Sequence, residues 1–210
     1  MSLILISAPE FLPQEVEHLQ AMFAAGLEVL HLRKPRAKPQ EMRSFLRHFS
    51  EAQTKRMMLH QAWEWAREIP VRGLHLKSEA QFGAKSEAIL SQLRSIRLEQ
   101  PQLMISMALH DPKKAVAWSK EVDYGILSPI WPSLSKPGYK NDWDLDKLKD
   151  QVRECPIPLY ALGGVTVARV AQAQKMNFIG VASLGSVWQA ADPLASLLEL
   201  KQACERAWKH

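Results

Sequence analysis

The sequence predicts a (β/α)8 TIM barrel, in which eight parallel strands alternate with helices and close on themselves. Eight short apolar or alternating runs follow one another along the chain, and most are separated by segments with apolar residues at helical spacing. A doubly wound open sheet shows the same alternation, but eight units within 210 residues favour the barrel. No stretch between the runs has the composition of a linker, so we predict a single TIM-barrel domain over residues 1–210.

The predicted strands are short, as expected for strands that contact a barrel interior on one face and helices on the other. In chain order they are LILIS (3–7), EVLHLR (28–33), RMMLH (56–60), GLHLK (73–77), LMISMALH (103–110), DYGILS (123–128), PLYALGG (158–164) and FIGVASL (178–184).

The predicted helices fill the segments between these runs. Apolar residues recur there at helical spacing, as in the sets Val16, Leu19, Met22, Phe23 and Ala88, Ile89, Leu93, Ile96. The connection after RMMLH is short, and its helix is marginal. Strand and helix therefore alternate throughout the chain.

Composition restricts the location of the protein. Apolar residues make up 47% of the chain, yet no window approaches the roughly 18 uninterrupted apolar residues of a membrane span. The N-terminus MSLILISAPEF has no basic segment before its apolar run, so it is typical of a first strand rather than a signal peptide. Cys155 and Cys204 have no partner at metal-ligand spacing and fit unpaired thiols in a reducing compartment. We expect a cytoplasmic protein that does not associate with membranes.

The net charge of +5 is compatible with a solvated basic surface or with attraction of a phosphorylated ligand. The 27 basic residues are spread along the chain among 22 acidic ones instead of forming one patch, which argues against nucleic acid as a partner. Phosphorylated small molecules are the expected partners. The sequence leaves both a monomer and a homo-oligomer open.

Polar residues alternate with apolar ones near the ends of several predicted strands. If Leu30 and Leu32 face the helices, His31 and Arg33 face the barrel interior. The same alternation gives interior positions to His60, His75, Ser106, Ala108 and His110. In a barrel the carboxyl ends of the strands surround the site, so four histidines and one arginine are expected to converge on one mouth.

Arg33 has the chemistry of a phosphate-binding residue. Its planar guanidinium holds two phosphate oxygens at once and stays charged at cellular pH. The structural alternative is an ion pair with an acid such as Glu79.

Two glycine-containing loops follow the seventh and eighth predicted strands. ALGGV (161–165) places Gly163 and Gly164 before a helix, and SLGSV (183–187) places Gly185 and Ser186 there. Such loops let backbone N–H groups approach an anion at a helix N-terminus, and they also make ordinary tight turns. Because the loops after strands seven and eight are the recurrent phosphate site of TIM barrels, we predict that these four residues bind a phosphate.

From the first strand to the last helix, the chain resembles a diverged member of the thiamine phosphate synthase and TenI (thiazole tautomerase) superfamily. HLRKP is similar to the family's Q-x-R-x-K, GLHL to G-V-H-L, SMALH to G-V-S-V-H, DYGILSPIWPSLSK to D-Y-V-x-x-G-P-I-F-P-T-x-T-K, PLYALGGV to P-V-V-A-I-G-G-I and GVASLGSV to G-V-A-V-V-S-A-I. The order and spacing of these segments carry the resemblance.

The resemblance implies an enzyme of thiamine biosynthesis that joins hydroxymethylpyrimidine diphosphate to thiazole phosphate and releases pyrophosphate. Ser133, Ser135 and Lys136 fall on positions that enclose the pyrophosphate in the family, together with Arg33. The prolines of this loop would reduce the entropy lost when it orders around an anion.

The magnesium positions of the family depart from its pattern. Its Asn-Asp pair falls on His60 and Gln61, and its second metal-binding Asp falls on Ala80, with Glu79 as the nearest acid. The resemblance implies Mg²⁺ as a possible cofactor, which prefers hard oxygen ligands. Both of the carboxylates that usually hold it are missing here, at Gln61 and Ala80, so the sequence assigns no metal ligands. The pattern's Lys falls on Pro35, beside Lys34.

Other departures affect the substrate-binding and acid–base positions. The Gln of Q-x-R-x-K is His31, and the thiazole-phosphate Ser falls on Gly185, next to Ser186. The acid–base His of the tautomerase branch falls on Pro129, which leaves that role to His110 or His60.

Three functions therefore remain as hypotheses. The first is the synthase, with Arg33, Lys136 and His110 as catalytic residues. The second is a TenI-like tautomerase or a non-catalytic homologue that binds phosphorylated ligands. A histidine-metal hydrolase at the same mouth is disfavoured, because the chain has no His-x-His pair and no Asp after the eighth strand.

Overall fold

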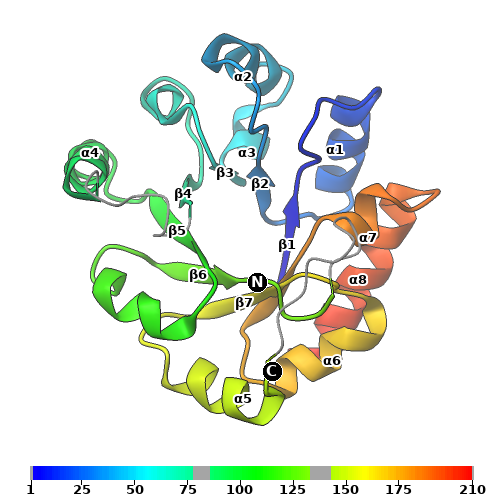
Figure 1. Cartoon of the computed structure of the whole chain (residues 1–210). Helices are drawn as coiled ribbons and strands as arrows, with labels where there is room; N and C mark the ends of the chain where they lie inside the picture. The colour runs from blue at the N-terminus through cyan, green and yellow to red at the C-terminus, as the bar shows by residue number, and fades with distance from the viewer. Residues whose placement is uncertain (1, 78–85, 133–142, 210) are drawn as a thin grey trace.

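The protein is a closed barrel of eight strands surrounded by helices (Figure 1). The computed structural model describes residues 2–77, 86–132 and 143–209. The strands are β1 (Leu3–Ile6), β2 (Leu30–Leu32), β3 (Met57–Leu59), β4 (Gly73–Leu76), β5 (Met104–Leu109), β6 (Tyr124–Leu127), β7 (Leu159–Leu162) and β8 (Gly180–Ser183). Each lies within one of the eight predicted runs, so the predicted strand order is confirmed.

Pairing of the first and last strands closes the barrel. Strand β1 pairs in parallel with β2 on one side and with β8 on the other, with Leu5 opposite both Leu30 and Ser183. Every other strand pairs in parallel with its neighbours in sequence. A doubly wound sheet would leave two open edges, so the closed pairing decides between the two predicted architectures in favour of the barrel.

The helices lie outside the strands. They are α1 (Glu15–Ala24), α2 (Pro39–Leu46), α3 (Glu51–Thr54), η1 (Trp63–Arg67), α4 (Ser86–Glu99), η4 (Pro112–Trp118), α5 (Leu145–Glu154), α6 (Val167–Lys175), α7 (Gly185–Trp188) and α8 (Pro193–Ala207). The marginal helix predicted after the third strand is the 3₁₀ segment η1, and η4 is also 3₁₀. None of the helices in the described part of the chain is long and apolar enough to cross a membrane.

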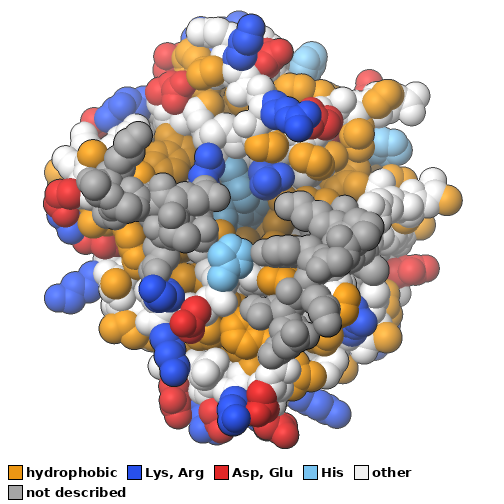
Figure 2. Space-filling model, viewed as in Figure 1, with side chains coloured by type: hydrophobic (Ala, Val, Ile, Leu, Met, Phe, Trp, Pro, Cys, Tyr) orange, Lys and Arg blue, Asp and Glu red, His pale blue; other side chains and the backbone are white. Residues whose placement is uncertain are grey.

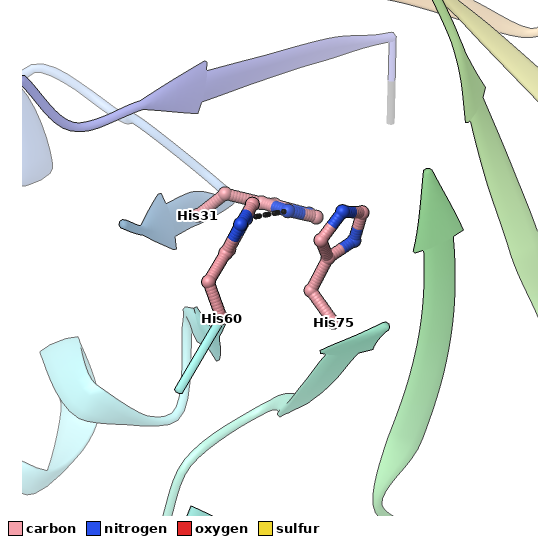
Figure 3. A group of neighbouring side chains, drawn as sticks. All are labelled: His31, His60 and His75. Atoms are coloured by element: carbon pink, nitrogen blue, oxygen red, sulfur yellow. Dashed lines mark hydrogen bonds between the residues drawn. The ribbon is translucent and has the colours of Figure 1, made fainter. Parts of the chain in front are cut away.

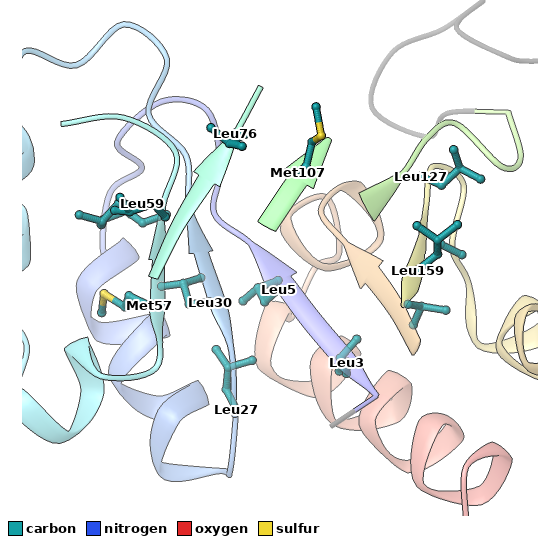
Figure 4. Packing of buried hydrophobic residues seen from close by; sticks show 14 of the residues in the cluster. Leu3, Leu5, Leu27, Leu30, Met57, Leu59, Leu76, Met107, Leu127 and Leu159 are labelled. Carbon is teal, nitrogen blue, oxygen red and sulfur yellow. The ribbon is translucent and has the colours of Figure 1, made fainter. Parts of the chain in front are cut away.

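Alternation along the strands separates two apolar clusters. The larger lies between the barrel and its helices and includes Leu30, Leu59 and Leu76 (Figure 4). Full burial of one such leucine stabilises the fold by about 1.5–3 kcal/mol. The smaller cluster fills the barrel and consists of Ile4, Ile6, Val29, Met58, Tyr124, Ile126, Tyr160 and Ala182.

Two glycines make room for large side chains in the barrel interior. A Cβ on Gly73 would overlap the Met104 carbonyl oxygen and lie 2.8 Å from the Met58 sulfur, and one on Gly180 would lie 2.5 Å from the Ser2 carbonyl oxygen and 2.6 Å from Tyr160 Cε1. All of these distances are shorter than a van der Waals contact. Glycine at these strand positions therefore allows the neighbouring backbone to approach closely and leaves room for bulky interior side chains.

Candidate functional site

Three histidines meet inside the barrel, at the carboxyl ends of neighbouring strands. His31 lies on β2, His60 directly after β3, and His75 on β4 (Figure 3). His31 Nδ1 lies 3.0 Å from His60 Nε2, and the His60 and His75 rings stack with centroids 4.0 Å apart. His31 is fully buried and His75 is 3% exposed, so the cluster is largely shielded from solvent.

Hydroxyl groups on β5 and β6 hold two of the rings. His31 Nε2 lies 2.7 Å from Tyr124 Oη, and His75 Nδ1 lies 2.8 Å from Ser106 Oγ. Burial raises the pKa of Tyr124, so its hydroxyl stays protonated at neutral pH. The rings are therefore fixed by neighbours across the barrel rather than by packing alone.

The environment keeps these histidines neutral. Burial is the largest cause that lowers the pKa of each ring, and it brings the pKa of His75 to about 3. Nearby positive charges add to this effect: Arg33 lowers the pKa of both His60 and His75, and Lys77 lowers that of His60. At neutral pH the cluster therefore consists of imidazoles, each of which can donate one hydrogen bond and accept another.

Arg33 follows β2 at the mouth and is only partly buried. Its backbone is held by Ser7, because the Arg33 N–H donates to Ser7 Oγ at 2.9 Å and the hydroxyl donates back to the Arg33 carbonyl at 3.2 Å. Within the described ranges, no carboxylate lies within ion-pair distance of its guanidinium. The alternative partner, Glu79, lies outside the described residues. Figure 2 shows Lys and Arg side chains beside histidine in a hollow near the centre of this face.

Lys34, next to Arg33, does not reach the mouth. Its ammonium lies 2.6 Å from the Glu15 carboxylate and donates to the carbonyls of Ala8 at 2.9 Å and Glu10 at 2.8 Å. Both charged side chains of the pair are 1% exposed. The ammonium is therefore not available to a ligand, because all three of its N–H donors are used inside the fold.

The described residues do not fit a magnesium site. The Gln61 side-chain amide donates to the Lys34 carbonyl and contacts the Met42 sulfur at 3.8 Å, so it supports the chain instead of facing a ligand. In the described part of the chain, the one group of three or more clustered ligating side chains is the histidine cluster, which contains no carboxylate. Mg²⁺ requires hard oxygen ligands that this set does not offer. Ala80 and Glu79 lie outside the described residues.

His110 is separate from the other three histidines. It follows the end of β5, is exposed, and its Nδ1–H donates to the Ser128 carbonyl at 2.6 Å. Three of the four predicted histidines therefore form one cluster. His110, which directly follows Leu109 at the end of β5, does not belong to it.

The two loops predicted to bind a phosphate differ in local structure: the glycines after β7 lie in a bend, whereas Gly185 after β8 begins a helix. Gly163 and Gly164 have φ values of 99° and 60°, and a Cβ on Gly163 would lie 2.8 Å from Pro129 Cα, so glycine is required for close packing against the loop after β6. Gly185 begins the one-turn helix α7, where the Ser186 hydroxyl lies 2.7 Å from the Ser183 hydroxyl.

The remaining predicted residues of the loop after β6, Ser133, Ser135 and Lys136, lie outside the described residues. Their roles stay predictions. Sequence reasoning gave no role to Tyr124 and Ser7, which position His31 and Arg33. The signal for Tyr124 was present, because its place in the run DYGILS puts it on the same face as the interior Ile126.

The fold and the mouth define a TIM-barrel protein whose strand ends carry buried neutral histidines and a partly buried arginine. A profile described as thiamine monophosphate synthase matches residues 3–187. This chain belongs to that family.

Relatives with known names agree with this assignment. A Geobacter sulfurreducens protein whose name refers to a thiamine-phosphate synthase is 24% identical over 179 residues, which are 83% of this chain and 80% of that protein. The thiamine-phosphate synthase of Albidiferax ferrireducens is 29% identical over 133 residues, 62% of this chain and 56% of that protein. The crystal structure of thiamine phosphate pyrophosphorylase from Bacteroides thetaiotaomicron has a TM-score of 0.76, 22% identity and 98% coverage of both chains, which supports the fold.

Proposed function

We propose that this protein is a thiamine-phosphate-synthase-like enzyme that joins hydroxymethylpyrimidine diphosphate to thiazole phosphate and releases pyrophosphate. The observation that carries the proposal is Arg33, a partly buried cation at the barrel mouth with no carboxylate partner among the described residues. A buried charge without a counter-ion is costly, so an anionic ligand is the natural partner of this guanidinium. Family membership supplies the substrate class.

The reaction needs stabilisation of a leaving pyrophosphate. The bond between the pyrimidine methylene carbon and the diphosphate oxygen breaks with its electrons on oxygen, and the thiazole nitrogen then bonds to the carbon. Arg33 supports the first step because its fork holds two oxygens of the group on which negative charge grows. Lys77, whose charge acts on His60, adds to the positive field at the mouth.

The neutral histidines suit the uncharged part of the substrate. A pyrimidine ring with an amino group offers both donors and acceptors, and a neutral imidazole can satisfy either kind. Because their pKa values are lowered, His31 and His60 add no positive charge next to the developing pyrimidine cation. We therefore assign substrate binding to the partly buried His60 and charge stabilisation to Arg33, whereas the fully buried His31, predicted from sequence to bind substrate, has both ring nitrogens engaged and positions His60 instead.

One observation favours a second candidate, a homologue that binds phosphorylated ligands without turnover. The described residues offer no carboxylate set for magnesium, and the Gln61 amide is engaged by the Lys34 carbonyl. A protein that has lost catalysis but kept Arg33 would bind pyrophosphate and form no product. Product formation separates the two functions.

The test combines calorimetry with inorganic pyrophosphate and a product assay for thiamine phosphate. Arg33→Lys should weaken pyrophosphate binding at least ten-fold and lower product formation, because an ammonium cannot reproduce the bidentate contact. The matched control is Arg47→Lys, at the exposed residue directly after α2, which should change neither pyrophosphate binding nor product formation. Equal pyrophosphate affinity in the parent and in Arg33→Lys would contradict the assignment of Arg33.

A further inference from the structure

The described residues hold one cluster of side chains with the chemistry of a transition-metal site, and the proposed reaction gives it no metal. The ligating nitrogens of His31, His60 and His75 all lie within 4.8 Å of one another. We propose that these three histidines bind one divalent ion of the zinc class, with imidazole nitrogen as the only protein ligand. This proposal concerns the free protein and does not rest on the proposed function.

The distances are close to those of a metal centre. For metal–nitrogen distances of about 2.1 Å in a tetrahedral site, the ligating nitrogens lie about 3.4 Å apart. His31 Nδ1 and His60 Nε2 are already 3.0 Å apart. All ligating nitrogens lie within 4.8 Å of one another, so the site would form by small side-chain shifts, mainly of the partly buried His60, within a fixed barrel.

Hydrogen bonds outside the cluster are compatible with the tautomers that ligate a metal. In the tautomer whose Nδ1–H donates to Ser106 Oγ, 2.8 Å away, His75 carries its lone pair on Nε2. In the tautomer whose Nε2–H donates to Tyr124 Oη, 2.7 Å away, His31 carries its lone pair on Nδ1. Metal-ligating histidines commonly donate their second N–H to such an oxygen.

The ligand set also selects the kind of ion. Neutral imidazole suits zinc, copper, nickel and iron, whereas Mg²⁺ prefers oxygen. Three protein ligands leave a fourth position open, as in catalytic zinc sites. Because no carboxylate belongs to the cluster, the ion would keep its full double charge, and the nearby Arg33 and Lys77 would weaken its binding. An anion in the open position would offset that repulsion.

The three proposed ligands are far apart in sequence, unlike the ligands of a short metal-binding motif. No His-x-His pair is present, and the ligands come from three successive strands instead. His31 faces Met58 in the β2–β3 register, and His75 faces Ser106 in the β4–β5 register. The barrel therefore assembles from separated residues a set that a short motif would not reveal.

The test is a metal titration of untagged, chelator-treated and desalted protein in the absence of any substrate. Zn²⁺ calorimetry should give one equivalent per chain, and Co²⁺ should give visible absorption bands of a nitrogen-ligated ion. His60→Ala, the least buried of the three positions, should weaken binding at least ten-fold. His48→Ala, an exposed histidine after α2, is the matched control and should leave binding unchanged.

Folding of each variant is checked by cooperative urea unfolding in chelator. If His60→Ala does not fold, Tyr124→Phe replaces it, and loss of the group that orients His31 should weaken metal binding by about 10–100-fold. In the parent, Zn²⁺ should shift the ring NMR signals of three of the 7 histidines. Absence of saturable binding, equal affinity in parent and His60→Ala, or shifts confined to other histidines would overturn the proposal. Since no substrate is present, that outcome leaves the proposed function untouched.

Discussion

Replacing Lys34 by Met should destabilise the protein strongly, although Lys34 lies next to the candidate site. The ammonium lies 2.6 Å from Glu15, and both side chains are 1% exposed. At this distance an effective dielectric constant of about 20 gives a gross attraction of about 6 kcal/mol, most of which offsets the desolvation of the two charges. Removing one partner leaves the other charge buried, and we expect the free energy of unfolding to fall by about 3–5 kcal/mol.

The assay is urea unfolding at pH 7, followed by circular dichroism, for Lys34→Met, Glu15→Gln and the double variant. The double variant should lose less than the sum of the two single losses, since neither charge then remains unpaired. Lys55→Met is the matched control: its ion pair with Glu51 has the same 2.6 Å length but is exposed, and its loss should cost less than about 1 kcal/mol. Equal losses for Lys34→Met and Lys55→Met, or additive losses in the double variant, would refute the reasoning.

Three further predictions concern pH, packing and thiol reactivity. In chelator-treated protein the unfolding free energy should fall as the pH drops below 6.5, by up to about 1.4 kcal/mol per pH unit for each buried histidine. The reason is that the unfolded chain binds protons that folded His75, with a pKa of about 3, does not. Urea titrations at pH 7.5, 6.5 and 5.5 check this, and it would be contradicted if His60→Ala left the dependence of the unfolding free energy on pH unchanged. Gly73→Ala should lower the unfolding free energy by about 3 kcal/mol, since its Cβ would overlap the Met104 backbone carbonyl oxygen and lie 2.8 Å from the Met58 sulfur. An unchanged urea midpoint would show that the strands have room for the added methyl group. Burial raises the pKa of Cys204 to about 12, so iodoacetamide at pH 8 should modify this thiol only after the protein unfolds. Rapid modification of Cys204 in the folded protein, detected by mass spectrometry, would show that the thiol is not buried.

Strand periodicity explains how much of the site could be predicted. Residues within a strand alternate between two faces, so His31 and His75 could be assigned to the interior from sequence. His60 lies beyond β3 but keeps the register, because its N–H donates to the Leu32 carbonyl at 3.2 Å. His110 lies beyond β5, is exposed and contacts Ser128. The alternation of side chains predicts which way a residue faces only while its strand stays hydrogen-bonded to the neighbouring strand.

The environment of Lys34 could not be predicted from its neighbours in sequence. Lys34 lies beside Pro35, where the family pattern has a lysine, but its partner Glu15 belongs to α1 and reaches it only through the packing of that helix against the barrel. The aromatic rings of Phe11 and Phe45, with centroids 4.9 Å and 5.4 Å from the ammonium, complete the enclosure. Such contacts depend on the assembled fold, which sequence spacing does not describe.

Product formation at different magnesium concentrations distinguishes a synthase that uses Arg33 and neutral histidines from one that requires a magnesium site. The parent is incubated with hydroxymethylpyrimidine diphosphate and thiazole phosphate, first without added Mg²⁺ and then up to saturation, and thiamine phosphate is measured. Because the described mouth offers Arg33 and neutral histidines instead of a carboxylate set, the account predicts product in every sample, with rates that differ by less than ten-fold. Absence of thiamine phosphate at all magnesium concentrations, or its formation only when Mg²⁺ is added, would contradict the account.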